Sequence, residues 1–336
     1  MAISDQVGVR VTEQTHVAEA RRTALRQLST SWSEHDVGRV ALLVTELAGN
    51  LVKHAQQTGE MLLRPLGDHG LEALCLDRGP GMSSVVRCLE DGYSTVGSPG
   101  TGLGAALRLS DSFDVFSRQE SGTAMVARLT RAGARQEPGR FELGVVSLPK
   151  PGEVACGDKW AIADLGSRTR ILMVDGLGHG DGAEEASGMA VAEFTRAPEG
   201  ALTEVLLRVH QALVPTRGAA VGIAELDPAM RALSFVGLGN IAGVAITDGA
   251  SRNLVSHSGT AGYRMARAQT YQYPWPSGAL LVLHSDGCAS RWSLDSYPGL
   301  IARHPSLIAG VLYRDFNRGR DDVTVLAVRN LMETQS

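Results

Sequence analysis

The chain has 336 residues, which is long for one ordinary core and fits two domains of roughly 100 to 200 residues each. Its hydrophobic fraction of 43% and charged fraction of 20% are typical of a folded globular protein, not of a disordered or fibrous one. A net charge of -4 gives no overall basic field, so neither nucleic acid nor an anionic membrane surface is expected as a partner.

The sequence offers no sign of export or membrane insertion. Apolar runs such as residues 40–44 and 279–283 are far shorter than the roughly 20 residues needed to cross a bilayer. The first ten residues include Asp5 and lack the basic-then-apolar order of a secretory signal. Four scattered cysteines form no CxxC pair, which argues against a zinc site and against a disulfide framework. We therefore expect a cytoplasmic protein without a membrane span.

Hydrophobic periodicity in the first half predicts helices packed on one face of a mostly antiparallel sheet. The alternating valines at positions 7 to 11 predict a strand, and a helix with an apolar stripe follows. A second helix is expected from Ser33 to about Ala55, with Asp36 as the capping-box partner of Ser33. Further strands are expected near 61–66, 71–76, 113–117 and 123–129, and helical stretches near 83–89 and 103–110.

A polar stretch at residues 131–140 contains Pro and Gly without an apolar period, and we place the domain boundary there. The expected domains are residues 1–132 and 141–330, joined by a linker over 133–140. The second domain is rich in strands, and its elements fit two sheets flanked by helices. Strands are expected over 143–148, 160–163, 170–174, 220–225, 233–236, 242–246, 279–283 and 323–328, and helices over 183–195, 202–214 and 306–316.

Three segments of the first half carry groups that suit phosphate chemistry. The second helix places Glu46 beside Asn50, where a carboxylate could activate an attacking group and an amide could ligate Mg2+. Asp77 follows a predicted strand and opens a tight turn, where a carboxylate can hold a purine amino group. The glycine-rich stretch 97–104 runs into a helix, whose bare amides can cradle phosphates. Taken alone, the helix face could be a solvated surface, the Asp77 segment a plain turn, and the glycine-rich stretch a flexible connector.

In chain order, the motifs ELxxN, DxGPGM and GTGLG resemble the N, G1 and G2 boxes of the histidine-kinase-like ATPase superfamily, which includes the anti-sigma-factor kinases. Over about residues 5–130 the chain resembles the RsbT-like switch kinases of bacterial stressosome systems. This resemblance implies a Bergerat-type α/β sandwich that binds ATP, with Glu46 as the general base and Asn50 as the Mg2+ ligand. It further implies nucleotide contacts from Lys53, Asp77, Gly79, Gly81, Gly100, Thr101, Gly102, Leu103 and Gly104.

Acidic residues in the second half stand beside glycine or at the ends of predicted strands. They are Asp158 in CGDKW, Asp175 in VDGLGHG, Asp286 in HSDG, and Asp321 with Asp322 in GRDDVT. A carboxylate set without converging His or Cys prefers hard ions such as Mg2+ or Mn2+. Two water-bridged ions would supply a nucleophile and neutralise phosphoryl oxygens. Asp-Gly also marks ordinary turns, but two of these motifs close apolar strands, RILMVD and LLVLHSD.

The order GD, DGLGHG, SDG and RDDVT resembles the PPM-type metal-dependent phosphatases, in the small bacterial branch typified by SpoIIE and RsbX, over about residues 141–330. The resemblance implies an αββα sandwich and Ser/Thr phosphatase activity, with catalytic roles for Asp175 and Asp286. Asp322 stands where the wider family often has Asn, which leaves its role open, and His179 is expected to be a loop residue. The implied metal ligands are Asp158, Asp175, the carbonyl of Gly176, Asp286 and Asp321.

Together the two resemblances predict a bifunctional signalling protein that is an ATP-dependent Ser/Thr kinase and an opposing phosphatase. The expected partners are STAS-domain anti-sigma-factor antagonists or stressosome scaffold proteins, and a homodimer is left open. Because running both activities at once wastes ATP, we expect nucleotide or partner binding to favour one at a time. In an alternative, the first domain only binds ATP or a partner and regulates the phosphatase. A sensor histidine kinase is disfavoured because no phosphoacceptor helix is visible, which leaves His16 and His54 poor candidates for autophosphorylation.

Overall fold

The computed structural model divides the chain into two compact units. The N-terminal unit comprises the described residues of Ser4–Glu137 together with Ser293–Arg314, and the C-terminal unit comprises the remaining described residues. The segment Ser293–Arg314 thus groups with the first half of the chain, although the residues before and after it belong to the C-terminal unit. The structure describes all residues except 1–5, 90–101, 135–138, 266 and 332–336.

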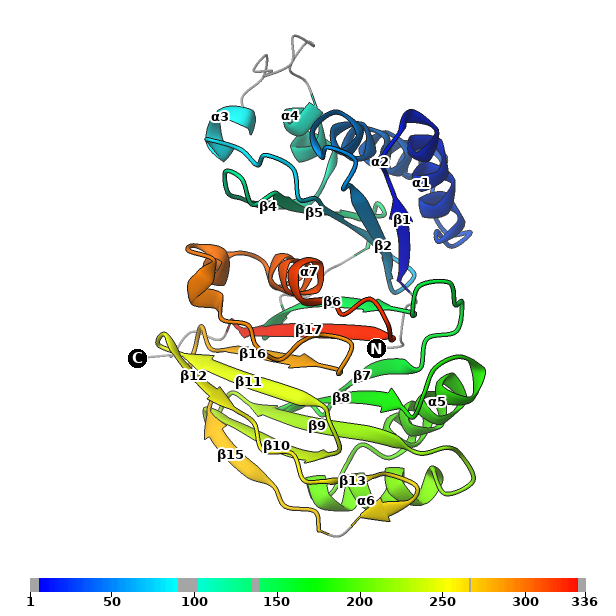
Figure 1. The fold of residues 1–336 in the computed structure, drawn as a ribbon, viewed down its shortest axis with the longest axis vertical. Coiled ribbons are helices and arrows are strands. Elements are labelled where there is room, and N and C mark those ends of the chain that lie inside the picture. Colours follow the sequence, from blue (N-terminus) through cyan, green and yellow to red (C-terminus); the bar gives the residue numbers. More distant parts are fainter. Residues whose placement is uncertain (1–5, 90–101, 135–138, 266, 332–336) are drawn as a thin grey trace. The chain divides into compact units, whose positions relative to one another are not determined.

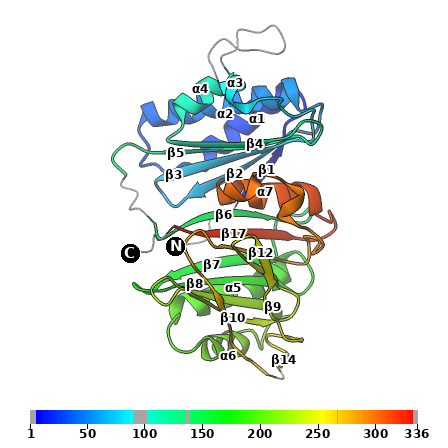
Figure 2. The ribbon, with the colours of Figure 1, turned by 90° about the vertical axis from the view of Figure 1, so that its left-hand side faces the viewer.

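The N-terminal unit is built on a five-stranded antiparallel sheet with the strand order β1-β2-β3-β5-β4. The strands are β1 (Val7–Arg10), β2 (Glu60–Leu66), β3 (Gly70–Leu76), β4 (Ser112–Ser117) and β5 (Thr123–Thr130). Helices α1, α2 and α4 lie on one side of this sheet, as Figure 2 shows, and confirm the predicted arrangement. Among residues 6–89 and 102–134, which the structure describes, the helices are α1 (Gln14–Arg26), α2 (Glu34–His54), α3 (Val85–Leu89) and α4 (Gly102–Leu109).

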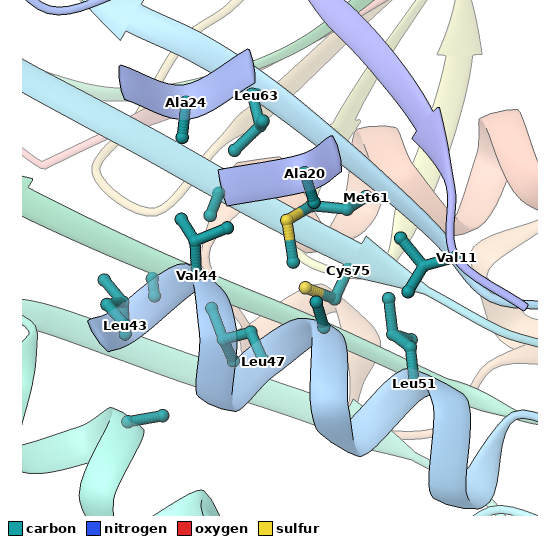
Figure 3. Packing of buried hydrophobic residues seen from close by; sticks show 14 of the residues in the cluster. Val11, Ala20, Ala24, Leu43, Val44, Leu47, Leu51, Met61, Leu63 and Cys75 are labelled. Atoms are coloured by element: carbon teal, nitrogen blue, oxygen red, sulfur yellow. The ribbon is translucent and has the colours of Figure 1, made fainter. Parts of the chain in front are cut away.

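The apolar stripe of α2 forms the centre of this core. Val40, Val44, Leu47 and Leu51 recur every three or four residues, so they share one helix face, and each is at most 1% exposed. Cys75 of β3 meets this face from the sheet side (Figure 3). Full burial of a Val or Leu side chain contributes about 1.5–3 kcal/mol, so this stripe holds α2 on the sheet.

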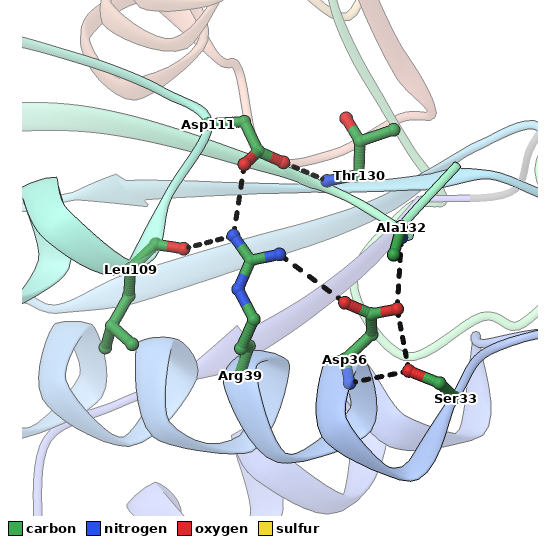
Figure 4. Close-up of polar contacts among 7 residues, drawn as sticks. All are labelled: Ser33, Asp36, Arg39, Leu109, Asp111, Thr130 and Ala132. Carbon is green, nitrogen blue, oxygen red and sulfur yellow. Dashed lines mark hydrogen bonds and ion pairs between the residues drawn. The ribbon is translucent and has the colours of Figure 1, made fainter. Parts of the chain in front are cut away.

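A buried carboxylate fixes the start of α2. Ser33 caps the helix as predicted, because its Oγ accepts the backbone amide of Asp36 at 3.1 Å. Asp36 Oδ2 accepts the backbone amide of Ala132 at 3.0 Å, and this bond holds the pKa of Asp36 below its ordinary value. Arg39 contacts Asp36 and also donates from Nη2 to Asp111 at 3.0 Å (Figure 4). The network joins the start of α2 to the residues that flank β4 and β5.

The C-terminal unit contains two five-stranded antiparallel sheets, with strand orders β15-β10-β9-β8-β7 and β12-β11-β16-β17-β6. The first sheet consists of β7 (Asp158–Asp164), β8 (Thr169–Gly176), β9 (Ala219–Asp227), β10 (Ala232–Leu238) and β15 (Tyr271–Pro274). The second consists of β6 (Phe141–Leu148), β11 (Ala242–Thr247), β12 (Ala250–Asn253), β16 (Leu280–His284) and β17 (Val323–Asn330). The other elements between residues 139 and 331 are α5 (Asp181–Arg196), α6 (Leu202–Ala212), α7 (Pro305–Phe316), the pair β13 (Gly259–Thr260) and β14 (Arg264–Met265), and two 3-10 helices, Leu294–Ser296 and Leu300–Ala302.

Strand β8 shows how this unit is layered. Ile171 and Met173 pack between the two sheets, while Leu172 and Val174 on the opposite face pack against α5 and α6. Figure 1 shows these two helices on the outer side of the first sheet. The predicted two-sheet core with flanking helices is confirmed. Short strands such as β12 were missed because all four of its residues are exposed and carry no apolar alternation.

No helix in the part of the chain that the structure describes combines the length and the apolar character of a bilayer span.

Asp36→Asn is expected to lower the free energy of unfolding by about 1–3 kcal/mol near neutral pH, because an amide cannot replace the charged acceptor of the Ala132 amide. Since the folded-state pKa of Asp36 is lowered, its stabilisation is complete above the unfolded pKa of about 3.9 and is lost as the pH falls through the folded pKa. Urea unfolding at several pH values should therefore show the difference shrinking in acid.

The exposed Asp68, whose side chain is 76% accessible, offers a matched control. Asp68→Asn should change the unfolding free energy by no more than about 0.5 kcal/mol. A loss for Asp36→Asn that is equally large at about pH 3 and about pH 7 would contradict this explanation.

Candidate functional site

The carboxyl-terminal half of α2 carries the polar residues predicted to meet ATP and Mg2+. Glu46 and Asn50 are half-buried and lie one helical turn apart, whereas Lys53 and His54 in the last turn are exposed. Nδ2 of Asn50 is buried and has no hydrogen-bond partner among the described residues. An unmatched buried donor costs about 1–3 kcal/mol, so this amide offers a donor to a bound ligand.

Asp77 follows β3 directly and is 6% exposed. Its Oδ1 accepts the backbone amides of Gly79 at 2.8 Å and Thr123 at 3.2 Å, which fix the carboxylate in place. Burial raises the pKa of Asp77 in spite of these two hydrogen bonds. Burial also lowers the pKa of His54, which the negative charge of Asp77 opposes. The end of α2 and the turn after β3 therefore lie close enough to interact electrostatically.

The turn after Asp77 requires glycine at two positions. Gly81 has a φ of +67°, and a Cβ there would lie 1.9 Å from the carbonyl oxygen of Arg118. A Cβ at Gly79 would lie 2.6 Å from the carbonyl oxygen of His54. No side chain fits at either distance, so Gly79 allows the turn to pack against the end of α2, and Gly81 allows it to pack against the connection between β4 and β5.

The third predicted nucleotide segment is only partly described. Gly100 and Thr101 lie outside the described residues. Gly102, Leu103 and Gly104 form the first turn of α4, and Leu103 packs against the core below α2. The structure thus brings the α2 face and the Asp77 turn together and places the start of α4 on the same helical layer.

Aspartates from four chain segments gather in the C-terminal unit. Asp158 opens β7, and Asp175 near the end of β8 is its partner in the antiparallel register. Asp286 follows β16, and Asp321 and Asp322 precede β17. Asp175 interacts electrostatically with Asp286, Asp321 and Asp322, and Asp158 does so with Asp175 and Asp322. The five carboxylates form one acidic cluster, called the carboxylate cluster below.

Negative charge is crowded in this cluster. Burial and the charge of Asp286 raise the pKa of Asp175 to about 7, and burial and the charge of Asp175 raise the pKa of Asp158 well above its ordinary value. Neutral neighbours donate hydrogen bonds to the cluster, among them Ser285 Oγ to Asp158 at 2.6 Å and Asn240 Nδ2 to Asp286 at 2.8 Å. These neutral donors do not neutralise the charge, so the arrangement favours a bound cation.

Asp322 holds backbone groups with both of its carboxylate oxygens. Oδ1 accepts the amide of Lys150 at 2.8 Å, and Oδ2 accepts the amide of Gly157 at 2.9 Å. Asp322 therefore positions the loop that leads into β7. In the same region His179 Nδ1 lies 2.5 Å from Glu153, and His179 Nε2 lies 2.9 Å from Lys150 Nζ. The His179 imidazole thus contacts two residues of the loop after β6.

The donor set fits a hydrated hard cation. No group of three or more His, Cys, Asp or Glu side chains within the described ranges is placed to hold an ion by itself. Mg2+ commonly keeps several waters and takes only one or two carboxylates, which the pairs Asp158 with Asp175 and Asp175 with Asp286 can offer. Gly176, predicted to ligate through its carbonyl, follows Asp175 and donates its amide to the carbonyl of Gly157 at 3.0 Å.

Comparison with known proteins finds a matching family model in each half of the chain. Residues 11–129 match the histidine kinase-like ATPase domain family, and residues 166–330 match stage II sporulation protein E (SpoIIE). Over 130 residues the chain is 32% identical to the serine/threonine-protein kinase RsbT of Bacillus subtilis, which covers 37% of this chain and 96% of RsbT. In this part the chain belongs to the RsbT family. It is a fusion of an RsbT-like ATPase domain with a SpoIIE-like phosphatase domain.

Two solved structures resemble the chain in fold. A chain from the structure described as "The bacterial stressosome: a modular system that has been adapted to control secondary messenger signaling" has a TM-score of 0.54 and 22% identity, and covers 57% of this chain and 100% of its own. The crystal structure of RsbX in complex with magnesium has a TM-score of 0.53 and 20% identity, and covers 58% of this chain and 97% of its own. At identities of 22% and 20%, these similarities establish a shared fold.

Several supporting residues of the SpoIIE-like domain were missed from the sequence. Ser285 stands inside the HSDG motif, so its contact with Asp158 could have been suspected from its neighbour Asp286. Asn240 is 46 residues from Asp286, and nothing in its surroundings signals the contact. Backbone amides such as that of Lys150 leave no trace in a sequence pattern.

Gly81→Ala in the RsbT-like domain is expected to weaken ATP binding at least about 10-fold, which corresponds to about 1.4 kcal/mol. The new Cβ would collide with the carbonyl of Arg118 and displace the turn that holds Asp77. Titration with a fluorescent ATP analogue measures the affinity.

Gly38→Ala on α2 is the matched control, because a Cβ there meets no atom within 4 Å. It should bind ATP like the wild type and gain about 0.5–1 kcal/mol of stability. Wild-type affinity in Gly81→Ala would refute the proposed role of the turn.

Asp175→Asn is expected to stabilise the metal-free protein and to reduce the stabilisation that Mn2+ gives. The raised pKa means that ionised Asp175 destabilises the folded state increasingly as pH rises from the unfolded pKa of about 3.9 to the folded value of about 7. In EDTA the variant's advantage in melting temperature should therefore grow between about pH 5 and about pH 8.

Asp164→Asn at the exposed end of β7 serves as the control, because the Asp164 carboxylate accepts a local hydrogen bond from the backbone amide of Gly166 at 3.0 Å. It should respond to Mn2+ like the wild type. Equal Mn2+ stabilisation of Asp175→Asn and the wild type would exclude Asp175 from the metal site.

Proposed function

We propose that the chain is a bifunctional switch enzyme. Its RsbT-like domain transfers phosphate from ATP to Ser or Thr of a STAS-domain partner-switch protein, and its SpoIIE-like domain removes that phosphate with divalent metal ions. The observation that carries the proposal is that each unit gathers its own set of groups suited to phosphate chemistry, Asn50 with Asp77 in one and the carboxylate cluster in the other. The relationship to RsbT supports a Ser/Thr kinase assignment for the first domain.

In the kinase reaction the residues of α2 and the Asp77 turn would have separate roles. Asp77, fixed by two backbone amides, accepts the purine amino group. Asn50 would hold Mg2+ through its amide oxygen, and its Nδ2, which is buried without a partner among the described residues, would donate to a nucleotide oxygen. Glu46, one turn earlier, accepts the proton of the attacking hydroxyl as general base. ATP supplies the phosphoryl group.

In the phosphatase reaction the carboxylate cluster binds the ions and its neighbours orient it. Mg2+ or Mn2+, when bound, activates water as the nucleophile and neutralises phosphoryl oxygens. Asp158, Asp175, Asp286 and Asp321 supply hard oxygen ligands. Asp322 keeps the loop before β7 in position through the amides of Lys150 and Gly157.

The proposal is tested with the full-length protein, labelled ATP, Mn2+ and a candidate STAS protein. Asn50→Ala should lower label transfer to the partner on the order of 100-fold and still remove phosphate from pre-labelled partner. Asp175→Ala should show the reverse and leave more label on the partner at steady state. Asp164→Asn should keep both activities.

Each activity can fail separately in this assay. Unchanged transfer by Asn50→Ala would overturn the kinase assignment and favour an RsbT-like domain that only binds ATP or a partner. Continued removal of phosphate by Asp175→Ala would overturn the phosphatase site. Acid-labile label on this chain instead of acid-stable label on the partner would indicate a histidine kinase.

A further inference from the structure

Every residue of strand β3 in the RsbT-like domain is buried. Helices α1, α2 and α4 cover only one face of the sheet, so they cannot account for the burial of side chains on the other face. Ala73 and Cys75 belong to the core under α1 and α2. Because side chains alternate across a strand, Glu72, Leu74 and Leu76 point to the opposite face, and they are at most 1% exposed. A further element must therefore cover that face.

The covering element is Ser293–Arg314, a segment from the second half of the sequence that groups with the N-terminal unit. Ser306 Oγ donates to Glu72 Oε2 at 2.7 Å, and Glu72 also pairs with Arg64 at 2.9 Å and Arg128 at 2.7 Å. Burial alone raises the pKa of Glu72, but the two guanidinium groups hold it well below its usual range. Ser306 therefore anchors the segment to a buried carboxylate whose charge the arginines of β2 and β5 balance.

Apolar packing along α7 is equally close. All residues of α7 from Pro305 to Arg314 are buried. A Cβ at Gly310 would lie 2.9 Å from Leu76 and 3.0 Å from Leu74, so the helix approaches β3 through its glycine. This part of α7 is a component of the RsbT-like unit's core.

The last residue of the docked segment reaches the nucleotide turn. Arg314 is 6% exposed and donates from Nη1 to the carbonyl oxygen of Asp77 at 2.9 Å. Its charge also opposes the rise that burial causes in the pKa of Asp77. Arg314 therefore holds the peptide of the residue that we expect to meet the purine.

After this arginine the chain returns directly to the carboxylate cluster. The carbonyl of Phe316 accepts the amide of Ala289 at 2.9 Å, and the amide of Arg318 donates to the carbonyl of Gly287 at 2.9 Å. Gly287 and Ala289 belong to the loop that immediately follows the aspartate of the HSDG motif. A single residue, Asp315, thus separates a contact at the nucleotide turn from a contact beside the predicted metal site.

We propose that Arg314 couples the two sites, so that nucleotide bound at the Asp77 turn changes the rate at which the SpoIIE-like domain removes phosphate. This inference rests on the function proposed above for each site. A nucleotide that fixes Asp77 also fixes the carbonyl that Arg314 holds, and Arg314 is joined through one residue to Phe316 and the loop after Asp286. The coupling is reciprocal, so Mn2+ at the cluster changes the affinity for nucleotide by the same factor.

The test measures Mn2+-dependent hydrolysis of p-nitrophenyl phosphate by the full-length protein with and without saturating ADP, at constant free Mn2+. In the wild type ADP should change kcat/KM by about 5-fold or more, which is the lower end of typical allosteric coupling. In Arg314→Gln the ratio should approach one, while hydrolysis without ADP stays near the wild-type rate. Arg314→Lys, which keeps a charged donor, should restore part of the ratio.

Arg303→Gln is the matched control, because Arg303 lies on the same docked segment but pairs with Asp114 at 3.2 Å, away from the nucleotide turn. It should keep the wild-type ratio. Gly310→Ala places a Cβ against Leu74 and Leu76 and so disturbs the packing of α7 on β3. It should also lower the ratio of kcat/KM with and without ADP, so the inference can be tested even if Arg314→Gln folds poorly. Melting curves and ADP titrations confirm folding and occupancy of each variant.

The outcomes separate this inference from the proposed function. If the wild type hydrolyses p-nitrophenyl phosphate at the same rate with and without bound ADP, the coupling is wrong but the phosphatase assignment stands. Arg314→Gln with the full wild-type ratio would also overturn it. Absence of Mn2+-dependent hydrolysis under all conditions would instead overturn the phosphatase assignment itself.

Discussion

Repulsion among buried carboxylates is the constraint on which the SpoIIE-like domain depends. Asp158 and Asp175 face each other across two paired strands, and both have raised pKa values because burial and neighbouring negative charge disfavour ionisation. A fold keeps such a cluster only if surrounding contacts hold it, and here Ser285, Asn240 and the amides bound by Asp322 do so. Crowded carboxylates lower the stability of the metal-free domain, which is the expected cost if the cluster binds cations as proposed.

In the RsbT-like domain, two buried carboxylates have partners that stabilise the ionised form. Glu72 is fully buried but paired with two arginines, and Asp36 is satisfied by a backbone amide and Arg39, so both pKa values are lowered. Asp77 stands between these cases, with two amide donors and a raised pKa. Residues with satisfied charge stabilise the unit, whereas the less satisfied Asp77 and the unpartnered amide of Asn50 remain available to a ligand.

Much of the fold could be predicted from the sequence, because its long elements carry strong periodicity. The stripe of α2, the Ser33 cap and the apolar run of β8 each indicated the element that the structure contains. The placement of Ser293–Arg314 in the N-terminal unit could not be predicted, since it depends on long-range contacts such as Ser306 with Glu72. Likewise, motifs identified the aspartates of the cluster, but the donors that hold them come from backbone amides and from distant residues such as Asn240.

The segment Ser293–Arg314, which lies within the second half of the sequence, belongs to the N-terminal unit and covers the second face of its sheet. The phosphatase activity proposed for the SpoIIE-like domain requires that the carboxylate cluster bind divalent ions. Electron paramagnetic resonance of Mn2+ titrated into the nucleotide-free, full-length protein tests it most directly. We expect the wild type to bind Mn2+ and Asp158→Asn to bind it far more weakly; no bound Mn2+ in the wild type, or unchanged binding in the variant, would contradict a metal site at the cluster.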